Sequence, residues 1–416
     1  MKKHIRAALG HPRLLHLFDR LMFTIGPATS QPSTFSLLIA PPGAGNIGDQ
    51  AMVEAFLENT PGNVRIICHG QQDICIPDQH AERTRVIVLP GLIYGHLLPH
   101  LRSIGVFRRL LGRAQMVAIT GADIMDGAYN WQASTNRANI AWLAAQANIP
   151  VRILGFSWNG RAHPQALAAL KRATAAGVQL CLRDPLSAER ARADGLANVT
   201  EVADIVFAAR TVNFATASQL LYSLPSQCNY ALVNASGLIG RSPVQIEGYV
   251  RIIRELQHHG LQVILLPHVS RPGGDDLPVC REICEALGDS TVLMIERLLS
   301  PAEIRGLTAG ATLTVTGRMH LAIMSLYSGV PAITLATQGK VEGMMRLFGA
   351  EFLAIEPRPD FAERIVALIQ QVLARPDDLR QHLHSKLPAV RTLARRNFDA
   401  AQPEPARQEE LSCAYD

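Results

Sequence analysis

The chain has 416 residues, of which 48% are hydrophobic and 18% charged, and its formal net charge at pH 7 is +5. This length predicts two domains, each long enough to bury a core. The small, thinly spread positive charge argues against a nucleic-acid-binding face and favours an anionic substrate. The seven cysteines show no paired spacing beyond Cys280 and Cys284. Such a set is typical of reduced thiols in a cytoplasmic protein.

Residues 1–34 predict an N-terminal amphipathic segment that precedes the first domain. Its apolar side chains recur at helical spacing and are Leu14, Leu17, Phe18, Leu21 and Met22. Pro12 and Asp19 interrupt any continuous apolar core, so the segment is not a secretory signal. Two interpretations stay open, in which the helix packs on the body of the protein or contacts a membrane surface peripherally. No run elsewhere approaches the ~20 apolar residues that a span requires, so we expect a soluble protein.

Residues 35–212 are predicted to form a first α/β domain. It opens with a buried strand over 35–40, a glycine-rich loop over 41–50, and a helix over 50–58. The loop contains a G-x-G-x-x-G spacing, but two prolines precede it and no acidic residue is convincingly placed for a ribose, which argues against a dinucleotide site. We expect the loop to approach a sugar or phosphate, with Asn46 and Asp49 as polar contacts. The alternative is that Asp49 only caps the helix.

Four more short apolar runs alternate with helix-length segments in this domain, and they are 85–89, 116–120, 151–156 and 179–182. This alternation predicts a parallel sheet that is covered by helices on both faces. Ligands bind beyond the C-terminal ends of the strands in such sheets. Asp123 and Asp126 follow one strand and are either ligand contacts or solvated loop acids. Arg183 follows another and either binds a ligand or joins a local turn network with Asp184.

Residues 213–400 are predicted to form a second α/β domain, followed by a polar tail over 401–416. The connection over 204–227 is expected to contain a final short strand of the first domain. The expected strands of the second domain are 229–234, 262–267, 291–295, 312–316, a strand that begins at Pro331, and 352–355. The expected helices are 244–259, 277–287, 321–328, 360–374 and 379–398. Two domains with facing strand ends would enclose a cleft.

The most informative stretch runs from Thr314 to Val341. Gly317 separates a β-branched strand from an apolar helical pattern, so Arg318, Met319 and His320 are predicted to lie at the start of a helix. Free backbone N–H groups and the positive end of the helix dipole favour an anion there. A solvated helix cap is the alternative, but an Arg beside a buried helix needs a partner or a ligand.

Four ordered blocks resemble the polysaccharide pyruvyl transferase family. They are Gly45-Asn46-Ile47-Gly48-Asp49, Arg183-Asp184-Pro185-Leu186-Ser187, Val202-Ala203-Asp204 after Gly195, and Arg318-Met319-His320 with Gly329-Val330-Pro331 and Lys340-Val341. The resemblance implies two Rossmann-like parallel-sheet domains that face a cleft, as in the GT-B architecture. It also implies transfer of a pyruvyl group from phosphoenolpyruvate to a sugar of a cell-surface polysaccharide, such as an exopolysaccharide, or of its lipid-linked precursor, forming a ketal.

That reaction suggests a role for each motif residue. Guanidinium groups suit the phosphate and carboxylate of the donor, so Arg318 and Arg183 are expected to clamp it from opposite domains. The helix start at Met319 would assist them, and His320 would act as a general acid or base. The remaining assignments are that Asp49 activates or orients the acceptor hydroxyl, that Asn46 contacts substrate, and that Lys340 either neutralises phosphate or is a surface lysine.

Neither a cofactor nor a metal is expected, because the reaction requires none and no metal-ligand spacing stands out. One rival hypothesis is a nucleotide-sugar-dependent glycosyltransferase of the GT-B fold. It calls for a ribose-binding acid in the second domain, for which Glu303 or Glu342 is available. A second rival is a catalytically silent protein that binds cell-surface glycans. The acceptor sugar and the oligomeric state stay open.

Overall fold

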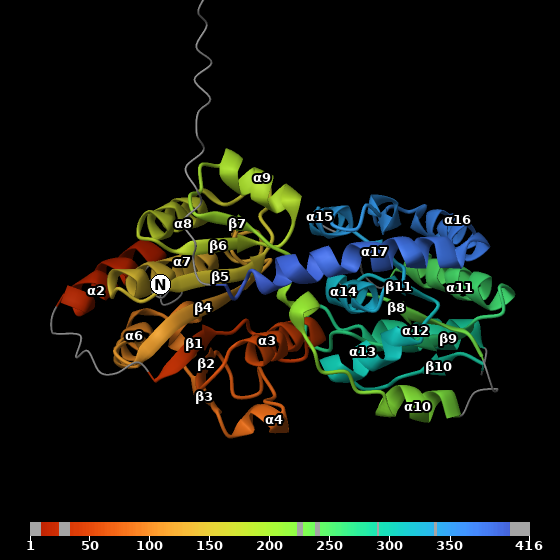
Figure 1. Cartoon of the computed structure of the whole chain (residues 1–416), viewed down its shortest axis with the longest axis horizontal. Coiled ribbons are helices and arrows are strands. Elements are labelled where there is room, and N and C mark those ends of the chain that lie inside the picture. The colour runs from red at the N-terminus through yellow and green to blue at the C-terminus, as the bar shows by residue number, and fades with distance from the viewer. Residues whose placement is uncertain are drawn as a thin grey trace, which may run out of the picture.

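The computed structural model describes residues 10–24, 34–222, 228–237, 242–288, 291–336 and 339–399. Each of two α/β domains is built around one parallel sheet, and the domains lie side by side (Figure 1). The predicted fold class is therefore confirmed. Over the described ranges, no helix is both long and apolar enough to cross a membrane. The predicted polar tail over 401–416 lies outside the described residues.

The first sheet has seven strands in the order β3-β2-β1-β4-β5-β6-β7. Its strands are β1 (Phe35–Ile39), β2 (Val64–Cys68), β3 (Thr84–Val88), β4 (Ala114–Ala122), β5 (Val151–Phe156), β6 (Gln179–Leu182) and β7 (Val199–Glu201). The helices are α2 (Pro12–Thr24), α3 (Ile47–Asn59), α4 (Asp78–Ala81), α5 (Gly91–Tyr94), α6 (Leu97–Leu111), α7 (Trp131–Gln146), α8 (Pro164–Ala175) and α9 (Pro185–Ala193).

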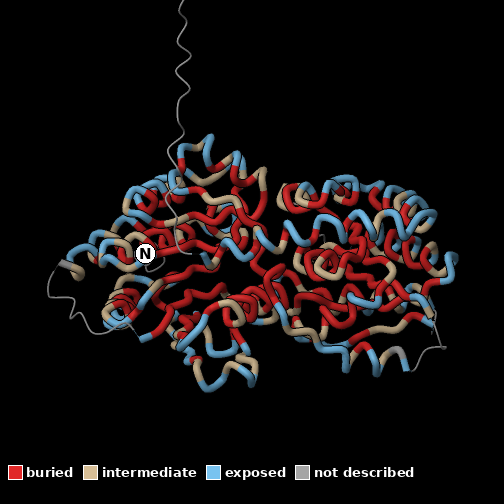
Figure 2. The backbone as a smooth tube through the Cα atoms, in the orientation of Figure 1, coloured by how far each residue is buried: buried red, intermediate tan, exposed pale blue. Residues whose placement is uncertain are grey.

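Neighbouring residues of the central strands face opposite sides of this sheet. Leu38 of β1 joins the apolar core that includes α3, whereas Leu37 joins the core formed with α6, α7 and α8. Both faces are therefore covered, which explains why these strands are continuous apolar runs. Figure 2 shows the buried residues concentrated along the strands of both domains and in the region where the domains meet.

Two expectations for the first sheet were wrong. Strand β2 was not among the expected strands, because Arg65 interrupts its apolar run, which follows closely on α3. A last strand was expected within 204–227, whereas the last strand is the three-residue β7. After β7, Asp204 accepts a hydrogen bond from the backbone N–H of Val206 at 3.0 Å and starts a 3-10 turn, η1 (Ile205–Ala208). This side-chain cap competes with strand pairing. Helix α10 (Ala215–Tyr222) follows.

The second sheet has six strands in the order β10-β9-β8-β11-β12-β13. Its strands are β8 (Tyr230–Asn234), β9 (Gln262–Leu265), β10 (Leu293–Met294), β11 (Leu313–Thr316), β12 (Ala332–Leu335) and β13 (Ala354–Ile355). The helices are α11 (Pro243–His258), α12 (Leu277–Leu287), α13 (Pro301–Ala309), α14 (Met319–Tyr327), α15 (Lys340–Arg346), α16 (Phe361–Ala374) and α17 (Pro376–Arg395). The edge strands β10 and β13 are shorter than predicted, and a 3-10 turn, η2 (Glu351–Leu353), replaces the start of β13.

The N-terminal helix α2 packs on the first domain, against α6 and α7. Leu15 is fully buried there, and the carboxylate of Asp19 contacts Nε2 of buried His100 at 2.8 Å. On the outer side of α2, Leu17 and Leu21 are exposed. Of the two interpretations, the structure supports packing on the body of the protein. Residues 1–9 and 25–33 of the predicted segment lie outside the described part of the chain.

The end of the chain connects the two domains. Helix α17 runs along the second domain toward the first (Figure 1), and Asn397 just beyond it is fully buried against the first domain. Its side chain accepts from the N–H of Gly155 at 2.9 Å and donates to the carbonyl of Ala203 at 3.0 Å. Its own carbonyl accepts from Arg152 at 2.9 Å. Asn397, near the end of the predicted 213–400 domain, thus packs on the first domain.

We predict that Asn397→Ala lowers the free energy of unfolding by about 2–4 kcal/mol, because it leaves the Gly155 N–H and the Ala203 carbonyl without partners in a buried place. Urea denaturation followed by circular dichroism measures the change. Arg395→Ala, at an exposed position in the last turn of α17, is the matched control and should change it by less than about 0.5 kcal/mol. Equal stability of the two variants would contradict the role given to Asn397.

Candidate active site

A cavity of about 380 Å³ lies between the domains, beyond the C-terminal ends of the strands of both sheets. Side chains from both domains line it. The seven residues predicted to form the site all line this cavity, and they are Asn46, Asp49, Arg183, Arg318, Met319, His320 and Lys340. Their convergence follows from topology, because the carboxyl ends of parallel strands meet at one edge of a sheet. Their individual roles stay predictions.

The glycine-rich loop after β1 forms one wall and is docked on the second domain. Asn46, not Asp49, is the N-cap of α3, because its Oδ1 accepts from the N–H of Gly48 at 2.9 Å. Its backbone pairs with Val269 in an isolated antiparallel bridge. Gly45 has φ 71°, and a side chain there would place Cβ 2.0 Å from the carbonyl oxygen of Ser270. Glycine is required for this close approach between the domains.

Asp49 is freed from capping and faces the cavity. Its Oδ2 accepts from the amide of Asn46 at 2.9 Å and lies 3.7 Å from Nη1 of Arg271. Burial raises the pKa of Asp49 to about 6, although the charges of Arg271 and His320 act in the opposite direction. A carboxyl group with such a pKa exchanges protons near neutral pH, as a general base or acid must.

Arg318 is the N-cap residue of α14, and its guanidinium is held by a buried carboxylate. Nε lies 3.1 Å and 3.2 Å from the two carboxylate oxygens of Asp276, and Nη2 donates to one of them and to the carbonyl of Gly274. Arg318 is therefore no solvated cap, and the partner that its burial demanded is Asp276. Asp276 was not among the predicted site residues, although it lies in the polar loop that follows β9.

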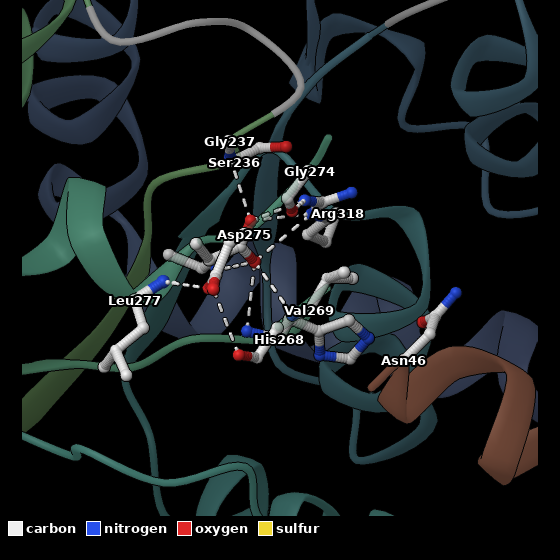
Figure 3. A network of polar contacts seen from close by, with 12 residues as sticks. Asn46, Ser236, Gly237, His268, Val269, Gly274, Asp275, Leu277 and Arg318 are labelled. Atoms are coloured by element: carbon white, nitrogen blue, oxygen red, sulfur yellow. Dashed lines mark hydrogen bonds and ion pairs between the residues drawn. The ribbon is translucent and has the colours of Figure 1, made fainter. Parts of the chain in front are cut away.

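Asp276 also organises the backbone around it (Figure 3). The fully buried carboxylate accepts from the N–H groups of Gly237 at 2.9 Å and of His268 and Val269 at 3.0 Å. Through these bonds, one side chain fixes the segments after β8 and β9 to Arg318. The pairing places the guanidinium at the wall of the cavity in a defined orientation.

A second carboxylate, Asp204, contacts two motif residues, Arg183 of its own domain and His320 across the domain boundary. Arg183 donates through Nη1 to Asp204 Oδ2 at 2.9 Å and through Nε to Ser157 Oγ at 2.8 Å. The same Asp204 oxygen lies 3.5 Å from Nε2 of His320. Burial alone would raise the pKa of Asp204, but His320 and Arg183 lower it to about 2. Asp184 makes no direct hydrogen bond to Arg183 in the described part of the chain and caps α9 through the N–H of Ser187, but Ser157 links the two residues by donating to Asp184 at 3.4 Å.

Lys340 forms an ion pair with Asp123 that spans the two domains. Tyr129 donates to the same carboxylate at 3.2 Å. Burial would raise the pKa of Asp123, but Lys340 and Arg183 hold it below its ordinary value. The pKa of Lys340 is in turn raised by Asp123 against the effect of its own burial. Lys340 is thus not a surface lysine, and Asp123 is not a solvated loop acid. Asp126 is buried and accepts from the N–H of Ala128 in a turn outside this cavity.

The start of α14 gives the cavity two further donors. Among the described residues, the N–H groups of Met319 and His320 have no hydrogen-bond acceptor. The side chain of His320 lies over the start of α3, where a Cβ on Gly48 would come within 2.3 Å of Nδ1. Within the described part of the chain, no group of three or more His, Cys, Asp and Glu side chains could hold a metal ion.

Two parallel-sheet domains with a cavity between their strand ends define the GT-B class of fold. A family model of polysaccharide pyruvyl transferases matches residues 46–339, and the chain belongs to this family. The match begins at the Asn46 loop and ends beside Lys340. A comparison with curated proteins finds no matching relative.

Solved structures support the same fold at low sequence identity. UDP-GlcNAc 2-epimerase from Neisseria meningitidis is 12% identical, with a TM-score of 0.54 over 87% of this chain and 97% of its own. A glycosyltransferase from Rickettsia africae is 13% identical, with a TM-score of 0.53 over 88% and 95%. Arabidopsis thaliana UGT89C1, complexed with UDP-L-rhamnose, is 12% identical, with a TM-score of 0.57 over 88% and 98%. These similarities establish the architecture alone.

The raised pKa of Asp49 predicts a pH-dependent effect of Asp49→Asn on stability. The folded state holds the Asp49 proton up to about pH 6, whereas the ordinary pKa is 3.8, so the ionised carboxylate destabilises the fold at higher pH. At pH 8 the variant should unfold with a free energy about 1–3 kcal/mol higher than that of the wild type, and the difference should vanish as the pH falls toward 4. Urea denaturation between pH 4 and 8 measures it. The exposed Asp78→Asn is the control, and a pH-independent difference would refute the assignment.

Proposed function

We propose that this protein transfers a pyruvyl group from phosphoenolpyruvate to a sugar of an exopolysaccharide or its precursor, and forms a pyruvate ketal. The observation that carries the proposal is the convergence of Arg183, Arg318, His320 and Lys340 on one interdomain cavity in a member of this family. The donor carries a phosphate and a carboxylate, and these cationic groups match its charge.

The donor would bind at the start of α14. Arg318 uses Nε and Nη2 for Asp276 and Gly274, so Nη1 is left to meet an anionic oxygen. The backbone N–H groups of Met319 and His320 point to the same helix end, where the dipole favours negative charge. Because Asp276 already holds the guanidinium in place, little ordering entropy is lost when the donor binds.

Arg183 and Lys340 would complete the donor site from both sides. Lys340 forms an ion pair with Asp123, so an incoming phosphate competes with that carboxylate for the ammonium group. Arg183 retains its contacts to Ser157 and Asp204, which direct the guanidinium toward the cavity that it lines. The two domains thereby share one dianionic group and are held together across it.

His320 and Asp49 would move the protons. His320, oriented by Asp204, would deliver a proton to the methylene carbon of the donor, and Asp49 would accept the proton of the first attacking sugar hydroxyl. Attack by the second hydroxyl then releases phosphate and closes the ketal. The two sugar hydroxyls lose two protons in all. One of them compensates for the proton that His320 delivered to form the methyl group, and the other leaves on the released phosphate. This scheme uses no cofactor beyond the donor.

The acceptor would enter along the first domain. Tyr94, Tyr129 and Arg137 line the part of the cavity that belongs to this domain. Aromatic faces and hydroxyl donors of this kind suit a saccharide, whose rings carry both apolar and hydroxyl surfaces. We place the reaction in the cytoplasm, and for a lipid-linked acceptor at the inner face of the membrane.

The nucleotide-sugar alternative loses one of its two candidate acids. Glu303 forms a capping box with Ser300 and binds Arg297, and these contacts lower its pKa to about 2 against the effect of burial. It lies outside the lining of the interdomain cavity. Its carboxylate is therefore committed to the start of α13 rather than directed at a ligand.

Calorimetric titration tests the donor directly. Phosphoenolpyruvate should bind the wild type saturably, and Arg318→Ala should weaken binding by about 10–100-fold, the value of a charge-assisted hydrogen bond. The affinity of Arg318→Lys for phosphoenolpyruvate should lie between those of the wild type and Arg318→Ala, because lysine keeps the positive charge but lacks the planar guanidinium group. Arg281→Ala, at an exposed position of α12, is the control. Binding of a nucleotide sugar in place of phosphoenolpyruvate would overturn the proposal.

We expect His320→Gln to lower kcat for phosphate release by at least about 100-fold, because glutamine cannot transfer the proton. The dissociation constant of phosphoenolpyruvate should change by less than about fivefold. A saccharide panel supplies the acceptor, and phosphate release is followed over time. The exposed His258→Gln is the matched control. If His320→Gln turns over at the wild-type rate, His320 does not transfer a proton in the reaction. That result would leave the proposal that phosphoenolpyruvate is the donor unchanged.

A further inference from the structure

We propose that His268 is a further ligand-binding residue of the cavity, whose neutral imidazole donates a hydrogen bond to an anionic oxygen of the donor. The inference rests on the proposed function, since it names an additional contact of the same donor. It adds a group from the β9 end of the second domain to the Arg318 and His320 pair. None of the four sequence blocks contains His268.

The first observation is an unsatisfied buried ring. His268 is only 1% exposed and lines the interdomain cavity, yet neither Nδ1 nor Nε2 has a hydrogen-bond partner within the described residues. Buried polar atoms almost always have partners in folded proteins. A partner that arrives with the ligand accounts for the missing hydrogen bond of the nitrogen that carries the proton.

A second buried histidine of the same chain shows the contrast. His100 is also 1% exposed, but its Nδ1 lies 3.2 Å from the carbonyl of Gly91 and its Nε2 2.8 Å from Asp19. His100 is a structural residue whose two nitrogens are both satisfied by the protein. His268 differs in that its backbone, rather than its ring, makes the structural bonds.

Those backbone bonds hold the ring in place. The N–H of His268 donates to Asp276 at 3.0 Å, and its carbonyl accepts from the N–H of Ile47 in the first domain at 3.2 Å. Figure 3 shows the ring of His268 on the side that faces Asn46. Because Asp276 also holds Arg318, the imidazole and the guanidinium keep a fixed relation to each other.

The charges around the ring decide its protonation state. Burial, and then the positive groups His320 and Arg318, lower the pKa of His268 well below its ordinary value. Asp276, Asp49 and Arg271 are the other charged groups at this wall, and the two carboxylates are engaged by Arg318 and Arg271. A neutral imidazole offers one N–H donor and one acceptor, so it adds a directional contact without a further charge.

The test compares two substitutions at this position by calorimetric titration with phosphoenolpyruvate. His268→Phe keeps a planar ring but removes both nitrogens, and we expect it to weaken binding by about 10–100-fold. His268→Gln restores an N–H donor and should recover most of that loss. In urea denaturation without phosphoenolpyruvate, His268→Phe should have the same free energy of unfolding as the wild type. The reason is that the substitution removes no hydrogen bond of the ring within the described residues.

Inorganic phosphate and pyruvate distinguish which anionic group the ring contacts. If His268→Phe binds inorganic phosphate more weakly but binds pyruvate normally, the ring contacts the phosphate of the donor. If it binds pyruvate more weakly but phosphate normally, the ring contacts the carboxylate. Unchanged phosphoenolpyruvate binding by both variants overturns this inference and leaves the proposed function intact. Absence of phosphoenolpyruvate binding by the wild type overturns the proposed function, and the inference with it. Destabilisation of the empty protein by His268→Phe, without weaker binding, would show a structural role instead.

Discussion

The buried ion pair between Asp276 and Arg318 is the interaction on which the site depends. A carboxylate with no solvent exposure is tolerated only when charge and hydrogen bonds compensate its lost hydration, and here a guanidinium and three backbone N–H groups do so. The same bonds fix the ends of β8, β9 and β11 relative to one another. Arg318 therefore enters the cavity wall as a positioned group rather than a flexible surface charge.

Electrostatic pairing continues across the domain boundary. Arg183 with Asp204, Lys340 with Asp123, and Arg271 with Asp49 each set a cation against a carboxylate in or beside the cavity. Two of these pairs join side chains of different domains, and His320 reaches Asp204 across the same boundary. The charged side chains of these pairs balance one another, and a polyanionic donor would have to redistribute the pairs. Ligand binding and domain contact are coupled through the same charged groups.

Much of the fold was predictable because parallel strands buried on both faces leave a strong signal. The two α/β domains, the corner at Gly317 and the strand ends that carry Arg183 and Lys340 were all evident from apolar runs that alternate with helical segments. The failures lie where local side-chain bonds or edge positions decide the structure. The side chain of Asp204 caps the turn η1 where a strand was expected. Strand β2 was not predicted, because Arg65 interrupts its apolar pattern.

The sequence by itself determined which residues stand at the strand ends, since that position follows from local periodicity and turn residues. Only the tertiary structure decided their partners. Arg318 and Asp276 are 42 positions apart, and Lys340 and Asp123 are 217 apart, so no local pattern links them. The lack of hydrogen-bond partners for the ring of His268 could not be predicted either, because the sequence around a histidine after a strand is the same whether its nitrogens have partners or not. Pairing between distant residues depends on how the two sheets face each other, which is a property of the packed chain alone.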